Sequence, residues 1–249
     1  MNEKTRIQIE EMKRQTIGVE VEMNNITREN AARIAADYFG TGRYKYTADR
    51  NGYYTWSAWD TEGREWKFQR DVSIAGVDSE KCELVTPILK YEDIPLLQEV
   101  VRALRRAGGV TGPRYCAGTH IHISADDYTP QQIRNLVNIF ASKEDFLWDA
   151  LQVSTARESY CRKMDKEFIK EINQKKPTDM ETIKRLWYHG RMSEQFQHYS
   201  NSRYVICNLH SFFQHGHYEI RAYNGTLHAG EVRSQIVLAL AISNAAMTK

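Results

Sequence analysis

The amino-acid sequence predicts a single α+β domain, and three features support this class. Stretches in which apolar and polar residues alternate, typical of strands, recur between stretches that carry helix-capping signals. The 249 residues, 41% of them hydrophobic, are enough for a large core without disulfides or structural metals. No internal repeat, low-complexity tract or Pro/Ser-rich linker divides the sequence. We therefore expect one domain over residues 1–249, with a polar, variable excursion around residues 154–200.

The first half of the chain alternates predicted strands and helices. A polar lead-in over residues 1–15 precedes a strand over residues 17–23, in which Glu20 and Glu22 share the face opposite the apolar side chains. Aromatic-rich runs on either side of residues 61–63 indicate a hairpin. In order, the further elements are a helix from Thr27 to Gly40, the hairpin within residues 44–72, a short strand over residues 81–89 and a helix from Asp93 to Ala107.

The second half follows the same logic. A capping box with Pro130 at the first helical position starts a helix at Thr129 that runs to about Leu151. Residues 154–177 are polar and rich in Arg and Lys, and we expect them at the surface. The remaining elements are a strand over residues 116–125, a helix opened by a second capping box at residues 178–181, strands over residues 203–213 and 217–224 joined by residues 214–216, and an apolar helix from about Gly230 to Met247.

Composition argues against several classes of protein. The 34 basic and 32 acidic residues leave a formal charge of +2 without a long basic block, which argues against a dedicated nucleic-acid-binding protein. The longest apolar run, residues 236–242, is far too short to span a membrane, and the charged N-terminus lacks a secretory signal. Because the four cysteines are widely spaced, we expect reduced thiols in a cytoplasmic protein. These cysteines are Cys82, Cys116, Cys161 and Cys207.

Three predicted strands carry ionisable side chains at alternate positions, which places each pair on one face of its strand. The pairs are Glu20 and Glu22, His120 and His122, and Glu219 and Arg221, and Glu83 adds a further acid on a strand. Carboxylates that converge on one face repel one another, and divalent cations would relieve that repulsion. Oxygen-rich ligands with one or two histidines suit Mg²⁺ or Mn²⁺. Nearby arginines can hold phosphate oxygens in a bidentate manner.

Each of these signals also has a purely structural explanation. An E-x-E pair can be the solvated face of a sheet, H-x-H can be satisfied by carbonyl groups, and E-x-R can be a plain ion pair. Arg157 and Cys161 lie in A-R-E-S-Y-C-R. This segment could reach a substrate carboxylate, but we expect it to be a solvated arginine-rich surface. The histidines without ligand-like spacing are expected at the surface or in local hydrogen bonds. They are His189, His198, His210, His215, His217 and His228.

The joint order of the motifs favours the functional interpretation. In sequence they are G-V-E-V-E, W-x-x-x-x-D-x-S, C-E-L-V-T-P, G-T-H-I-H-I, R-Y-x-x-x-N-L and E-I-R-A-Y-N-G-T-L, between Gly18 and Leu227. This order resembles the amidoligase family, carboxylate–amine ligases with the glutamine synthetase and γ-glutamylcysteine ligase fold. The resemblance implies a curved, mostly antiparallel sheet, a half-barrel, with helices packed on its outer face.

The resemblance also implies roles for individual residues. Ligands of two divalent metals would be Glu20, Glu22, Glu83, His120 and Glu219. His122 would lie beside the nucleotide phosphates, and Arg221 would meet the transferring phosphoryl group or the substrate carboxylate. Arg203 and Asn208 match phosphate- and substrate-facing positions. Asp71 and Ser73 match a substrate-side segment, in which Asp71 would orient or deprotonate the amine.

The implied activity is an ATP-dependent ligation with Mg²⁺ or Mn²⁺, in which an acyl phosphate forms and an amine then displaces phosphate. The carboxylate and the amine could belong to small molecules, peptides or proteins, and an oligomer is compatible with the sequence. The sequence has no Walker-type glycine loop, so ATP binding is inferred from the metal cluster and the resemblance. Two alternatives stay open: a phosphotransferase on the same fold, and a non-catalytic binding protein that uses its arginines and tyrosines, for example on nucleic acid.

Overall fold

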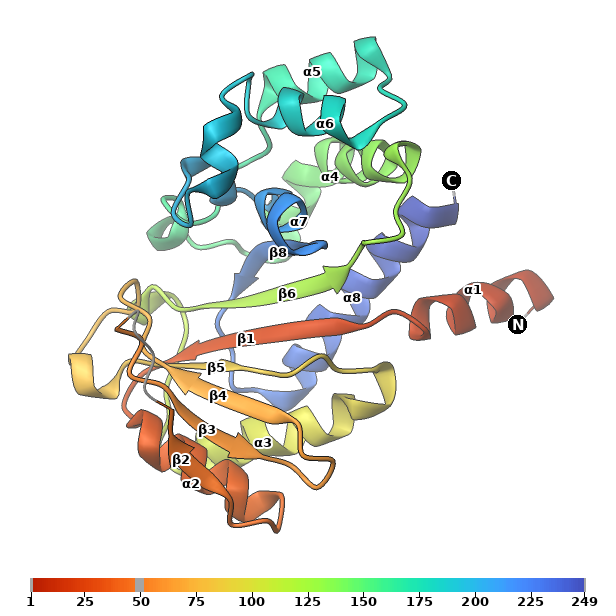
Figure 1. Cartoon of the computed structure of the whole chain (residues 1–249). Coiled ribbons are helices and arrows are strands. Elements are labelled where there is room, and N and C mark those ends of the chain that lie inside the picture. Colours follow the sequence, from red (N-terminus) through yellow and green to blue (C-terminus); the bar gives the residue numbers. More distant parts are fainter. Residues whose placement is uncertain (1, 48–51, 249) are drawn as a thin grey trace.

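An open antiparallel sheet of eight strands forms the centre of the computed structural model, which describes residues 2–47 and 52–248 (Figure 1). The strand order is β2-β3-β4-β5-β1-β6-β8-β7, and the sheet does not close into a barrel. The strands are β1 (Ile17–Met23), β2 (Tyr44–Tyr46), β3 (Trp56–Trp59), β4 (Glu65–Gln69), β5 (Cys82–Val85), β6 (Gly118–Ser124), β7 (Cys207–Asn208) and β8 (His217–Asn224).

Helices cover one face of this sheet. Helix α2 packs on β2 to β5, α8 packs on β6, and α3 lies between these two helices (Figure 1). The α-helices of the described residues are α1 (Glu3–Lys13), α2 (Arg28–Tyr38), α3 (Ile94–Arg106), α4 (Pro130–Ala150), α5 (Lys166–Lys175), α6 (Met180–Trp187), α7 (His210–His215) and α8 (Ala229–Thr248). None of them, within residues 2–47 and 52–248, combines the length and the apolar character needed to cross a bilayer.

The central strand β1 shows how the sheet separates core from site. Val19 and Val21 are buried in the hydrophobic core beneath the helices. Because side chains alternate along a strand, Glu20 and Glu22 point to the opposite face. The α+β class and the antiparallel sheet are therefore confirmed, whereas the glutamine synthetase half-barrel stays a prediction.

Several local predictions are confirmed. Thr129 and Gln132 form the reciprocal capping box, with Pro130 in the first turn of α4. The two aromatic-rich runs pair as β3 and β4, and β2 extends them to a three-stranded meander. The four cysteines are free thiols.

The strand predicted over residues 203–213 is wrong for most of its length. Only Cys207–Asn208 pairs with β8, and α7 begins directly afterwards. The side-chain oxygen of Asn208 accepts hydrogen bonds from the backbone N–H groups of His210 and Ser211, which starts a helix at this point. Gly216, with φ of 75°, ends that helix in the left-handed conformation that glycine adopts at little cost.

Two predictions between residues 154 and 181 also need correction. Helix α6 is capped by Asp179, which accepts a hydrogen bond from the backbone of Thr182, and not by a capping box opened one residue earlier. The segment 154–177, expected at the surface, contains the amphipathic helix α5. Its residues Phe168 and Ile172 are buried, since they lie four positions apart on one helix face.

Candidate functional site

Strand register brings the predicted acidic and histidine residues together on the face of the sheet opposite α2 and α8. We call Glu20, Glu22, Glu83, His120, His122 and Glu219 the acidic cluster. Residues that lie directly opposite one another on neighbouring strands are Glu22 and Glu83, Glu20 and His120, His122 and Glu219, and Glu219 and Asn208. Since opposite residues have neighbouring side chains, four strands contribute to one cluster.

The cluster offers donor sets with the spacing of metal ligands. In each of three sets, one oxygen or nitrogen atom per residue lies within 4.8 Å of the others. The sets are Glu20, Glu83 and His120; Glu20, His122 and Glu219; and Glu22, Asp71 and Glu83. Carboxylate oxygens with one histidine are ligands that Mg²⁺ and Mn²⁺ accept. These donors therefore fit the pair of divalent cations that the family resemblance implies.

Glu20 connects the two histidines of β6. One carboxylate oxygen lies 3.0 Å from Nδ1 of His120, and the other lies 3.2 Å from Nε2 of His122. Burial alone would raise the pKa of Glu20, but His122 and His120 together hold it well below its ordinary value. The ionised carboxylate of Glu20 therefore faces both imidazoles.

Glu22 and Glu83 are buried carboxylates that lie close to other acidic groups. Burial raises the pKa of Glu22 and Asp71 adds to that rise, whereas His120 and Arg157 oppose it. Burial also raises the pKa of Glu83 well above its ordinary value, and Glu20 and Asp71 raise it further. Gly118 N–H donates to Glu22, and the Gln69 amide donates to Glu83 at 2.9 Å. This half of the cluster has an excess of negative charge that a cation would neutralise.

Glu219 belongs to a buried ion pair at the other end of the cluster. Burial would raise its pKa, but the neighbouring Arg221 guanidinium lowers the pKa to about 2. Arg221 contacts one carboxylate oxygen of Glu219, and the Asn208 amide donates to the other at 2.7 Å. Arg221 also donates from Nε to the backbone oxygen of Tyr160 at 3.0 Å. Glu219 is thus ionised and held in a fixed position.

The three remaining predicted residues lie at the edge of the cluster. Asp71 shares a donor set with Glu22 and Glu83, and it accepts hydrogen bonds from the backbone and the hydroxyl of Ser73, both at 2.6 Å. Ser73 therefore positions Asp71. Arg203 lies farther out: it donates to the backbone oxygen of His198, and its guanidinium is close to the tyrosine rings at positions 199 and 204.

Arg157 is a site residue for which the sequence-based expectation is wrong. In place of a solvated surface, it occupies the interior: only 1% of it is exposed, and one terminal nitrogen lies 3.2 Å from Nε2 of His120. The other terminal nitrogen donates to the backbone oxygen of Tyr223. No local pattern identifies this position, because the contact joins residues 37 apart in sequence.

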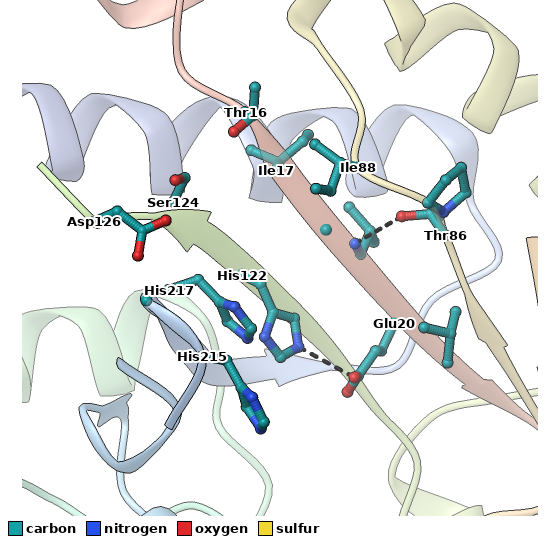
Figure 2. Close-up of a pocket in the computed structure, with 15 residues that line it drawn as sticks. Thr16, Ile17, Glu20, Thr86, Ile88, His122, Ser124, Asp126, His215 and His217 are labelled. Carbon is teal, nitrogen blue, oxygen red and sulfur yellow. Dashed lines mark hydrogen bonds and ion pairs between the residues drawn. The ribbon is translucent and has the colours of Figure 1, made fainter. Parts of the chain in front are cut away.

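A first pocket of about 290 Å³ opens beside Glu20 and His122 (Figure 2). We call it the histidine pocket, because His215 and His217 also line it. The rings of His122 and His217 meet edge to face with centroids 4.8 Å apart, and His215 stacks on His217. Burial lowers the pKa of His217 to about 4, with His122 adding to the effect. Ile17, Val85, Pro87 and Ile88 make the rest of the wall largely apolar.

A second pocket of about 290 Å³ lies beside Asp71 and Arg221. We call it the arginine pocket. Its other lining side chains are Tyr53, Arg70, Val72, Ser73, Tyr160, Tyr199, Arg203 and Tyr204. Arg70 is paired with Asp78, whereas Arg203 has no ion pair with any carboxylate among the described residues. The histidine pocket is lined by two members of the acidic cluster, whereas the arginine pocket reaches the cluster through Asp71 and Arg221, which lie next to it.

A family model described as "Putative amidoligase enzyme" matches residues 13–243, nearly the whole chain. The chain therefore belongs to the amidoligase family, whose members are enzymes of the ligase type. No curated protein and no solved structure matches it.

Proposed function

We propose that this amidoligase is an ATP- and divalent-metal-dependent carboxylate–amine ligase that works through an acyl phosphate. The observation that carries the proposal is the acidic cluster between two chemically different pockets. Four glutamates and two histidines share one sheet face, and Glu22, Glu83, His120 and Glu219 are buried there. Buried carboxylates in this number are costly for a purely structural sheet.

Two divalent cations would be held by the donor sets of the acidic cluster. Glu20, His122 and Glu219 form one end, and Glu22, Asp71 and Glu83 form the other. His120 completes a third set with Glu20 and Glu83, which joins the two ends. The ions would neutralise the charge of the phosphates and of the phosphoryl group in transfer. Our assignment of Asp71 to this second set adds a ligand role to the role toward the amine that the sequence suggests.

The two pockets suit the two sides of a ligation. The histidine pocket has an apolar wall for a nucleobase and opens onto Glu20 and His122, where phosphates would meet the cluster. The arginine pocket offers Arg203 and Arg221 to a carboxylate and Asp71 to an amine. A nucleotide and an acceptor that enter from these two pockets would meet at the cluster.

The chain's own groups can then serve each step. Arg221 lies where it can steady the carboxylate while an oxygen of that carboxylate takes the γ-phosphoryl group from ATP. Asp71 accepts a proton from the attacking amine, whose nitrogen bonds to the acyl carbon as phosphate leaves with the carboxylate oxygen. Because hydrolysis competes with the amine, exclusion of water from the arginine pocket favours ligation.

Calorimetry tests the proposal most directly. ATP is titrated into the wild-type protein with Mg²⁺, with Mn²⁺ and with EDTA, and into Glu20→Gln and the exposed control Glu29→Gln. We expect metal-dependent binding that Glu20→Gln loses and Glu29→Gln keeps, and turnover at least about 100-fold lower in Glu20→Gln. Binding that ignores both the metal and Glu20 would refute the assignment. Products then separate the alternatives, since only a ligase consumes the amine, whereas a phosphotransferase releases a phosphorylated product.

A further inference from the structure

Arg157 places a guanidinium inside the acidic cluster. The side chain comes from the short turn Thr155–Arg157 and is anchored through Nη1 on the backbone oxygen of Tyr223. Its Nη2 lies 3.2 Å from Nε2 of His120, and its Nε is buried without a hydrogen-bond partner among the described residues. Burial lowers the pKa of Arg157, and the nearby carboxylate of Glu22 opposes that shift. Arg157 is therefore a fixed cation beside Glu22 and His120.

Gly118 makes room for this guanidinium. A Cβ atom at position 118 would lie 2.2 Å from Nη2 of Arg157 and 2.6 Å from its Cζ. The backbone of Gly118 is not in the left-handed region, so an alanine there is not excluded by conformation. The absent side chain, and not a special φ angle, is what admits Arg157.

Hydrogen-bond chemistry makes the Arg157 contact incompatible with metal coordination by His120. An arginine only donates, so Nε2 of His120 accepts, and the ring proton is on Nδ1, which faces Glu20 at 3.0 Å. A neutral imidazole has a single free lone pair, and Arg157 occupies it. Coordination through Nε2 would displace the guanidinium directly. Coordination through Nδ1 would move the ring proton to Nε2, where it would face the Arg157 N–H.

We infer that the Arg157 guanidinium occupies Nε2 of His120 in the metal-free protein, and that this hydrogen bond must break before His120 can bind a divalent metal. This inference rests on the metal dependence in the proposed function. It has a consequence for the second substrate, because residues 157–161 form one turn: the N–H groups of Tyr160 and Cys161 both bond to the Arg157 backbone oxygen. The backbone oxygen of Tyr160 accepts a hydrogen bond from Nε of Arg221, and Tyr160 lines the arginine pocket. Release of Arg157 thus links metal loading to the pocket for the acceptor.

Manganese binding to the ATP-free protein tests the inference without any turnover. Wild type, Arg157→Met, Arg157→Lys and Glu20→Gln are titrated with Mn²⁺ in a calorimeter. We expect Arg157→Met to bind Mn²⁺ about tenfold more tightly than wild type, because a charge-assisted hydrogen bond no longer competes. Arg157→Lys keeps the charge but loses the planar guanidinium that contacts both His120 and Tyr223, so its Mn²⁺ affinity should lie between those of wild type and Arg157→Met.

The outcomes separate the inference from the proposed function. Equal or weaker Mn²⁺ binding by Arg157→Met than by wild type overturns the inference and leaves the proposed function intact. Absence of binding in all the variants and in wild type overturns the metal dependence itself, and the inference with it. Should Arg157→Met fail to fold, Gly118→Ala replaces it, since the added methyl group expels the guanidinium and should tighten Mn²⁺ binding in the same direction.

Nitrogen NMR of the histidine rings gives a second test, which reads the position of the ring proton and does not depend on a measured metal affinity. In the metal-free wild-type protein, His120 should carry its proton on Nδ1 and show an unprotonated Nε2, assigned with His120→Gln. Added Mg²⁺ should change the His120 ring nitrogens and the Arg157 guanidinium signals together. A metal-free spectrum with the proton of His120 on Nε2 would overturn the inference, because Arg157 could not then donate to that atom.

Discussion

Glu22 of β1 lies directly opposite Glu83 of β5, and the two residues are only 2% and 4% exposed. Like charges opposite each other in a sheet destabilise it, and burial adds to the cost. The Glu22–Glu83 pair therefore lowers the stability of the sheet when no metal ion is bound. Lower stability at functional residues is a common cost of activity.

Replacement of Glu83 by glutamine should stabilise the metal-free protein. We expect a gain of about 1–2 kcal/mol in the free energy of unfolding at pH 8. Because the pKa of Glu83 is raised in the folded state, its ionisation penalises folding increasingly as pH rises above the ordinary glutamate value, so the gain should be smaller at pH 5. Urea unfolding with EDTA at both pH values measures it, with Glu29→Gln as control. A Glu83→Gln variant less stable than wild type at pH 8 would contradict the charge argument.

Asn208 should stabilise the protein through its amide, which donates to the carboxylate of Glu219, and not only through the oxygen that caps α7. Asn208→Asp keeps the oxygen that caps α7 but replaces the donor to Glu219 by a second carboxylate. We expect it to lower the stability of the metal-free protein by about 2–3 kcal/mol, with partial recovery in Mn²⁺. Thermal unfolding with EDTA and with Mn²⁺ gives the comparison. Asn208→Ala loses the cap as well, and its thermal stability should not recover in Mn²⁺. An equal response of the two variants to Mn²⁺ would argue against this interpretation.

Asp60 should stabilise the β3–β4 hairpin through its ionised form. It accepts hydrogen bonds from the Arg64 backbone and side chain and from the Trp66 indole. Although burial raises the pKa of Asp60, these bonds hold it below its ordinary value. Its contribution is therefore present above the ordinary aspartate pKa and is lost as pH falls through the lower folded value. Asp60→Asn should cost about 1–3 kcal/mol at pH 7 and much less near pH 3, as followed by urea unfolding.

Arg203 should select the acceptor without affecting the nucleotide. Arg203 lines the arginine pocket and forms no ion pair with a carboxylate within residues 2–47 and 52–248. Arg70, in the same pocket, is neutralised by Asp78. Once a substrate pair is known, Arg203→Met should raise the KM for the carboxylate about 10- to 100-fold and leave ATP affinity unchanged. Arg70→Met serves as the matched control and should have the smaller effect. A loss of ATP affinity in Arg203→Met would place this residue on the nucleotide side instead.

Sequence by itself determined the local parts of the site. Alternation in residues 17–23 and 116–125 identified two strands and placed Glu20 with Glu22, and His120 with His122, because strand geometry fixes which side chains share a face. The capping box at Thr129 determined the start of α4, since that signal is complete within four residues. Helix α7 was missed because Asn208 acts both in a strand and as a cap, which alternation cannot distinguish.

Only the tertiary structure decided which side chains of neighbouring strands lie opposite one another on the face that carries the site. Strand order and register placed Glu83 against Glu22 and Glu219 against His122, and no local pattern encodes the pairing of segments about 60 or 100 residues apart. The same holds for Arg157, whose charged side chain favours the surface on composition alone. It is buried because Gly118, His120 and the Tyr223 carbonyl form a space of matching shape and chemistry. That space exists only after the sheet and the turn have come together.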